Sequence, residues 1–141
     1  MAATVKVRLS VEIEGLDSDD QANLSRAFTH DVTPEEYFKG RDIIGSTAAN
    51  LDLGAIDDTD LTGVLIIARG TADTDYVGIL IDDAGTGTPS TAAGNLTLNA
   101  GEAVYLNFGG STGGLTNGKY IRVKGSAATT AITYFVFGKH T

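Results

Sequence analysis

Residues 61–69 read Leu-Thr-Gly-Val-Leu-Ile-Ile-Ala-Arg, and this stretch is the strongest indication of the fold class. It contains a continuous apolar run, Val64–Ile67, of the kind that a central strand shows when both of its faces are buried. Gly, Thr and β-branched residues are frequent in the chain, and no long helical period is present. The sequence therefore predicts an all-β protein.

Further short strands are expected after residue 43, because apolar segments alternate there with turn residues. They are expected at 49–56, 61–69, 75–81, 95–99, 103–108, 119–124 and 131–137. A tight turn is expected at 100–102, a second at Asn117-Gly118, and glycine-rich loops over 82–94 and 109–114. With two N-terminal strands, this gives the eight or nine short antiparallel strands typical of a single-domain β-sandwich or jelly roll.

The N-terminal 42 residues are expected to form a hairpin and a crossover. Apolar and polar residues alternate strictly over 4–14, which predicts a strand with one buried face. Residues 23–32 fit one face of a helix and also one face of a strand, and we favour a strand that returns against the first. We therefore expect an N-terminal hairpin or arm over 1–42 and a β-sandwich core over 43–141, together forming one domain.

Thr33-Pro34-Glu35-Glu36 has the residues of a helix start. Thr33 can cap the helix, Pro34 stands where a missing N–H is harmless, and Glu36 completes a capping box. Gly40 can end the helix after at most two turns. An irregular crossover with the following aromatic residues packed down is the alternative.

Composition excludes several classes of function. The chain has 141 residues, no cysteine, two histidines and a net charge of -8. Disulfides, thiolate metal sites and cysteine nucleophiles are excluded, and the acidity argues against nucleic-acid binding. No apolar run approaches the roughly 18 residues that a membrane span needs, so no membrane partner is expected.

The charges are unevenly distributed along the chain. All 18 acidic residues and six of the ten basic residues lie within 1–102, whereas 103–141 holds Lys119, Arg122, Lys124 and Lys139 and no acid. Opposite charges on one domain suit contacts with copies of itself or docking on a charged scaffold. The alternative is that both charge groups are solvated surface.

Two glycine-rich motifs match catalytic patterns without their required context. Gly109–Gly113 has the form G-x-S-x-G around Ser111, but no helix can follow it and no acidic residue follows the serine. Gly113–Lys119 has the form of a phosphate-binding loop, but Tyr120 replaces the hydroxyl residue that holds Mg²⁺ and a strand follows.

For the other polar and aromatic residues, a structural role is favoured over a catalytic or ligand-binding role. Aspartates cluster at 57–60, 73–75 and 82–83, where they could hold Ca²⁺ but match no EF-hand and are typical of turns. His30-Asp31 has no accompanying nucleophile. The ten aromatic residues could stack sugars, but most alternate within strands and are expected in the core. We assign no catalytic, cofactor-binding or metal-binding residue.

Six segments resemble a group of small virion proteins of tailed bacteriophages. They are Ile44–Thr47, Leu51–Gly54, Gly63–Ile67, Asp75–Gly78, Leu98–Glu102 and Ile132–Phe137. The resemblance covers roughly 43–138 and concerns strands and turns. It implies a jelly-roll or β-sandwich capsid decoration (cement) protein without chemistry or cofactor.

The expected function is therefore that of a non-enzymatic virion protein on the capsid surface. The resemblance implies homotrimers bound to the major capsid protein, and the expected mechanism is stabilisation of the head by bridging its subunits. One alternative is a tail, collar or fibre-base component. An alternative of another class is a Ca²⁺-dependent carbohydrate-binding β-sandwich.

Overall fold

All regular structure in the described part of the chain is β-structure, as the composition predicted. The computed structural model describes residues 3–12, 23–32, 37–56, 61–69, 75–82, 84–89, 96–108 and 120–138. The strands are β1 (Ala3–Glu12), β2 (Asn23–Val32), β3 (Tyr37–Ile43), β4 (Ala49–Asn50), β5 (Leu61–Arg69), β6 (Tyr76–Asp82), β7 (Leu96–Asn99), β8 (Ala103–Asn107), β9 (Tyr120–Gly125) and β10 (Ala131–Gly138).

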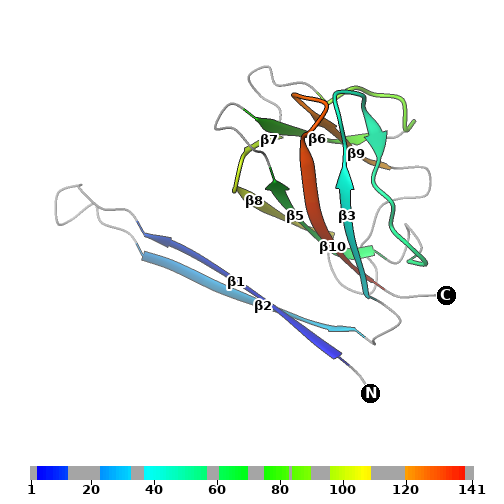
Figure 1. Cartoon of the computed structure of the whole chain (residues 1–141). Helices are drawn as coiled ribbons and strands as arrows, with labels where there is room; N and C mark the ends of the chain where they lie inside the picture. Colours follow the sequence, from blue (N-terminus) through cyan, green and yellow to red (C-terminus); the bar gives the residue numbers. More distant parts are fainter. Residues whose placement is uncertain are drawn as a thin grey trace.

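Strands β3 to β10 form two four-stranded antiparallel sheets that pack face to face as a sandwich (Figure 1). The first sheet has the order β3-β10-β5-β8, and the second has the order β4-β9-β6-β7. The predicted β-sandwich of about eight strands is confirmed. The apolar run at 61–69 forms β5, which lies between β10 and β8 inside the first sheet, as its sequence predicted.

The core lies between the two sheets and is built from alternate residues of the central strands. Each strand directs every second side chain inward, so its buried residues are two positions apart. The buried apolar residues of the central strands are Val64, Ile66 and Ala68 of β5, Ile132, Tyr134 and Val136 of β10, Val77 and Ile79 of β6, and Ile121 and Val123 of β9.

Tyr134 is the largest side chain of this core, and a glycine makes room for it. A Cβ atom built on Gly40 of β3 would lie 2.1 Å from the Tyr134 ring, so only glycine fits opposite the tyrosine in the register. The Tyr134 hydroxyl donates a hydrogen bond of 3.3 Å to the Asp42 carboxylate. Burial raises the pKa of the Tyr134 phenol, and the negative charges of Asp42 and Asp52 add to this rise.

Strands β1 and β2 form a hairpin that is a separate two-stranded sheet. Its register runs without interruption from the pair Ala3 and Val32 to the pair Glu12 and Asn23. Figure 1 shows this hairpin extending away from the sandwich. The preferred prediction of a strand over 23–32 that returns against the first strand is confirmed.

Two sequence predictions about local structure were wrong. A helix ending at Gly40 was one alternative, but Tyr37–Ile43 is strand β3, which pairs with β10 along its whole length. Residues 33–36, the expected helix start, lie outside the described residues. The structure shows that pairing with a long neighbouring strand decided the conformation of 37–43.

The strand expected at 49–56 contains only the two residues of β4. The chain turns after Leu51, because the Asp52 side chain accepts a hydrogen bond of 2.8 Å from the Gly54 N–H. Gly54 has a φ of 67°, a conformation that side chains rarely adopt. The alternation of leucines over 51–55 was therefore not the signature of a strand.

Candidate functional site

The outer face of the first sheet is the most distinctive surface of the described residues. The register places residues of neighbouring strands in rows across the sheet, and members of one row lie on one face. One row holds Lys39, Phe135, Leu65 and Tyr105 of β3, β10, β5 and β8. The next two rows toward one end are Arg41, Thr133, Ile67 and Ala103, and then Ile43, Ala131 and Arg69.

A shallow hollow of about 290 Å³ lies on this face, lined by Lys39, Arg41, Arg69 and Thr133. Its origin is visible in the register, because Thr133 and Ala131 of the central strand β10 are short. The longer cationic side chains stand on the strands at either side. Three cations and one hydroxyl group around a hollow can bind carboxylates, and the arginine forks can do so with two parallel hydrogen bonds.

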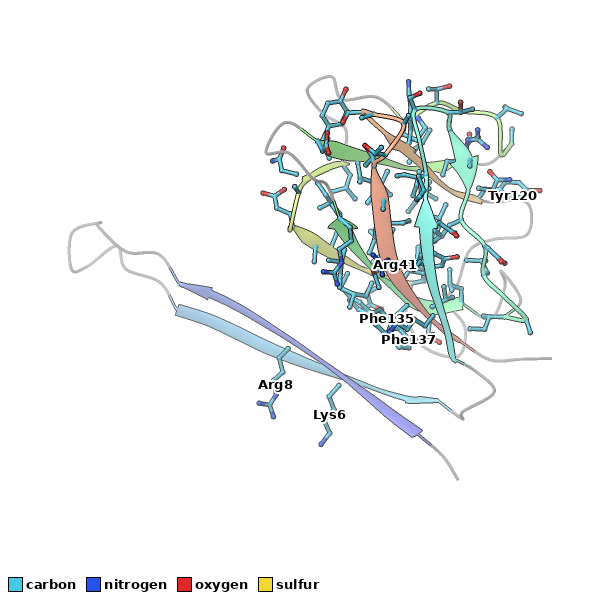
Figure 2. The ribbon with its side chains drawn as sticks, viewed as in Figure 1. Lys6, Arg8, Arg41, Tyr120, Phe135 and Phe137 are labelled. Atoms are coloured by element: carbon cyan, nitrogen blue, oxygen red, sulfur yellow. The ribbon has the colours of Figure 1, made fainter. Side chains whose placement is uncertain are left out.

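Apolar side chains continue the face beside the hollow. The Lys39 ammonium lies 5.4 Å from the centre of the Phe135 ring, a cation–π geometry. Leu65, Ile67 and Phe135 are each half-buried, so part of every one of these side chains faces outward. Figure 2 shows Arg41, Phe135 and Phe137 gathered on this side of the sandwich. The face thus combines apolar side chains with one cation in each of three successive rows.

Tyr105 completes the apolar centre. A Cβ atom built on Gly63 of β5 would lie 2.2 Å from the Tyr105 hydroxyl oxygen, so the tyrosine lies directly over that glycine. Burial raises the pKa of the Tyr105 phenol. The Tyr105 ring therefore packs directly on the backbone at Gly63.

Residues 84–89 cover part of the outer face of the second sheet, over Leu80 and Arg122. Arg122 of β9 is only 9% exposed and holds this loop. Its guanidinium donates hydrogen bonds to the carbonyl oxygens of Gly85 and Gly87, and also to the Asn50 side chain and the Ala48 carbonyl oxygen. The cation is therefore used inside the fold.

Asp82 of β6 holds the same loop from its other side. The carboxylate accepts hydrogen bonds of 2.7 Å from the N–H groups of Thr86 and Gly87. The Gly87 hydrogen bond is the main cause that holds the pKa of Asp82 below its usual value of 3.8, and nearby Arg122 contributes. Asp82 is thus a structural anchor, as expected of an aspartate in a turn.

The structure describes few of the residues that were considered for chemistry. Ser111, Lys119, His140 and the aspartates at 57, 58, 60, 73 and 83 lie outside the described residues. His30 lies in β2 and Asp75 is buried before β6. Among the residues that the structure describes, no cluster of three or more His, Asp or Glu side chains could hold a metal ion. The same residues contain no helix that could cross a membrane.

Aromatic residues are divided between core and surface. Tyr134 is buried in the core, as expected for aromatics in a two-layer core, Phe137 is buried on the other face of β10, and Tyr120 is 40% exposed. The Tyr120 ring lies against the backbone of Gly85, where a Cβ atom would approach it to 2.8 Å. This exposed tyrosine therefore supports the loop over the second sheet.

The cationic cluster of the first sheet was missed in the sequence. The uneven charge distribution drew attention to the four basic residues after 103, of which Arg122 is buried and Lys119 and Lys139 lie outside the described residues. Lys39 and Arg41 do alternate along β3, which is the signal for a shared face. The helix interpretation of 33–40 hid that signal, and Arg69 joins them only through the register with β10.

Comparison with known proteins finds no matching family model, no matching curated protein and no matching solved structure.

Proposed function

We propose that this chain is a non-enzymatic structural protein of a tailed-bacteriophage virion, acting as a capsid decoration protein that stabilises the head by bridging shell subunits. The observation that carries the proposal is the order of the strands. β3 pairs with β10, β4 with β9, β5 with β8, and β6 with β7. This nested pairing in two four-stranded sheets is the jelly-roll order, which occurs in viral capsid proteins and also in lectins and cupins.

The sequence resemblance supports the same proposal. The segments that resemble phage virion proteins lie in β5, in and beside β6, in β7 and its following turn, in β10, and in the turns before and after β4. They thus belong to the sandwich. The resemblance concerns the residue patterns of these strands and turns, and the strand order concerns how the same strands pair.

A bridging role needs surfaces that can contact more than one neighbour. The hairpin that extends from the sandwich and the apolar-cationic face of the first sheet supply two such surfaces (Figure 1). A protein that binds only the assembled shell lowers the free energy of that shell relative to its dissociated subunits. Stabilisation by bridging follows from binding alone and requires no reaction.

The test is the copy number of the chain in purified phage particles, measured by quantitative mass spectrometry against the major shell protein. Hundreds of copies per particle are expected for a decoration protein. Six to a few dozen copies would refute decoration and assign the chain to the tail, collar or fibres. Absence from particles would refute any virion role, and melting with and without Ca²⁺ and glycan arrays would then test the carbohydrate-binding alternative.

A further inference from the structure

The cations of the first sheet lie on a face without acidic residues. The three rows of this face described above contain Lys39, Arg41 and Arg69 and no aspartate or glutamate, although the chain has 18 acidic residues and a net charge of -8. Asp42, the residue after Arg41, belongs to the other face of β3, where its carboxylate accepts the hydrogen bond from Tyr134. None of the three cations forms an ion pair with the residues that the structure describes. Positive charges that the fold does not neutralise favour a bound anion.

Thr133 adds a buried polar group to this cluster. Its side chain lines the hollow of about 290 Å³ between the cations, and the residue is only 8% exposed. Within the described part of the chain, its hydroxyl forms no hydrogen bond. A buried hydroxyl without a partner costs free energy, and an oxyanion in the hollow would accept a hydrogen bond from it. The floor of the hollow is thus prepared for an acceptor.

The spacing of the three cations favours a ligand with more than one oxyanion group. Lys39 and Arg41 are two positions apart on β3, so their Cα atoms are about 7 Å apart. Arg69 lies two strands away and one row further along, which places its Cα atom about 12 Å from that of Arg41. A single carboxylate or phosphate group fills only part of this area. A ligand with two or three such groups can place one near each cation.

The volume of the hollow sets the size of the ligand. A volume of about 290 Å³ is at the lower end of the range of roughly 300–1,000 Å³ that is typical of small-molecule sites. Arginine binds carboxylate and phosphate groups through two parallel hydrogen bonds, and lysine supplies a point charge. A compact polycarboxylate or a short phosphate chain has the size and the charge that these groups match.

We propose that the hollow between Lys39, Arg41, Arg69 and Thr133 binds a small polyvalent oxyanion, a ligand that carries two or more carboxylate or phosphate groups. The two arginines hold the ligand from the β3 side and the β5 side, the lysine neutralises a further charge, and the threonine donates a hydrogen bond from β10. The proposal goes beyond a bridging role, which needs no small ligand. It does not rest on a role in a virion, since this chain alone supplies every contact.

The first test is isothermal titration calorimetry of the full chain at low ionic strength, with citrate and with tripolyphosphate as probes. A Kd of about 1 mM or below is expected for at least one of them, and acetate and monophosphate are expected to bind at least about tenfold more weakly. Tighter binding of citrate would support a polycarboxylate ligand, and tighter binding of tripolyphosphate would support a phosphate chain. Binding of neither probe, or equal binding of the anions with a single group, would overturn the proposal.

Matched variants test whether the hollow, and not the overall charge, binds the probe. Arg41→Gln and Arg69→Gln are each expected to weaken binding of the tighter probe at least about tenfold, because each removes a bidentate donor. Lys124→Gln changes the net charge by the same amount on the other sheet and is expected to weaken binding less than about twofold. Circular dichroism melting checks that each variant retains the fold. Equal weakening by Lys124→Gln would overturn the proposal.

The threonine provides a test in which the charge stays constant. Thr133→Val removes the hydroxyl and is expected to weaken binding at least about fivefold, whereas Thr133→Ser keeps the hydroxyl and is expected to bind within about twofold of wild type. A Thr133→Val variant that binds like wild type would overturn the proposal.

Nuclear magnetic resonance of the ¹⁵N-labelled wild type locates the bound probe without any substitution. Amide shift changes are expected to concentrate at the residues that line the hollow, and changes concentrated elsewhere would overturn the proposal. These measurements use the purified chain and no phage particle. Their failure is therefore distinguishable from failure of the proposed function.

Discussion

Arg122 is expected to be the side chain on the outer face of the second sheet whose replacement costs the most stability. The proposed change is Arg122→Met, which keeps the aliphatic length of the side chain and removes its five N–H donors. The guanidinium is 9% exposed and is the common donor to the loop 84–89, to Asn50 and to Ala48. Its removal therefore leaves several carbonyl oxygens without their donor at once.

The magnitude follows from these hydrogen bonds. A hydrogen bond from a charged group contributes about 1.5–3 kcal/mol, but bonds made by one guanidinium are not additive and its burial has a cost. We expect a loss of about 3 kcal/mol in the free energy of unfolding. For a domain of this size the Tm then falls by roughly 10 °C. The urea midpoint falls by about 1.5–2 M if m is near 1.5–2 kcal/mol/M.

The assay is urea unfolding followed by circular dichroism, with Lys124→Met as the control. Lys124 lies two residues further along β9 on the same face and is half-buried. Its replacement is expected to cost less than about 0.5 kcal/mol, as for most surface positions. If the two variants lose the same stability, Arg122 does not hold the loop, and the structural account of the second sheet is wrong.

Three further predictions concern the anchors of the sandwich. Gly40→Ala is expected to lower the Tm by more than 5 °C, because the new methyl group would collide with the Tyr134 ring, and a variant that melts like wild type would contradict that packing. Ile66→Ala is expected to cost about 3–4 kcal/mol, since the side chain is fully buried in the central strand β5; a loss below about 1 kcal/mol in urea unfolding would place it outside the core. The pKa of Asp82 is lowered in the folded state, so its contribution is complete above its usual value of 3.8 and is lost as pH falls through the folded value. Asp82→Asn is therefore expected to melt below wild type at pH 7 and to match it near pH 2, whereas an equal Tm deficit at both pH values would exclude the charge as the cause.

The strands that could be predicted are those in which the pattern of apolar residues is typical of a strand. The apolar run of β5 and the strict alternation of β1 depend on burial patterns that are local in the sequence. The boundaries of β2 and β5 coincide with the predicted ones. The local signal was sufficient for β5, whereas residues 23–32 also fitted a helix and were favoured as a strand because they could return against the first one.

Two regions were predicted wrongly because an interaction other than the alternation of side chains decides their conformation. Residues 37–43 contain a glycine and two cations, and only pairing with β10 makes them a strand. Residues 51–56 alternate as a strand would, but the Asp52 side chain and the left-handed Gly54 turn the chain instead.

The candidate site could not be predicted either, because its residues come together only through strand pairing. Lys39 and Arg69 are thirty residues apart in the sequence and come together only because β10 lies between β3 and β5. The hollow between these cations exists because Ala131 and Thr133 of β10 are short. Nothing in the sequence around Ala131 and Thr133 indicates that they lie beneath a hollow. A site made by register becomes predictable only when the strand order is known.

The edge strands of the two sheets differ in how they limit pairing with another sheet. An exposed edge strand invites pairing with another sheet, and proteins prevent this with short edge strands and with charges. The edge strands β4 and β7 of the second sheet have two and four residues, and the edge strand β3 of the first carries Lys39 and Arg41. Among the residues that the structure describes, the hairpin differs, because each of its ten-residue strands pairs only with the other and so has one long edge open to pairing.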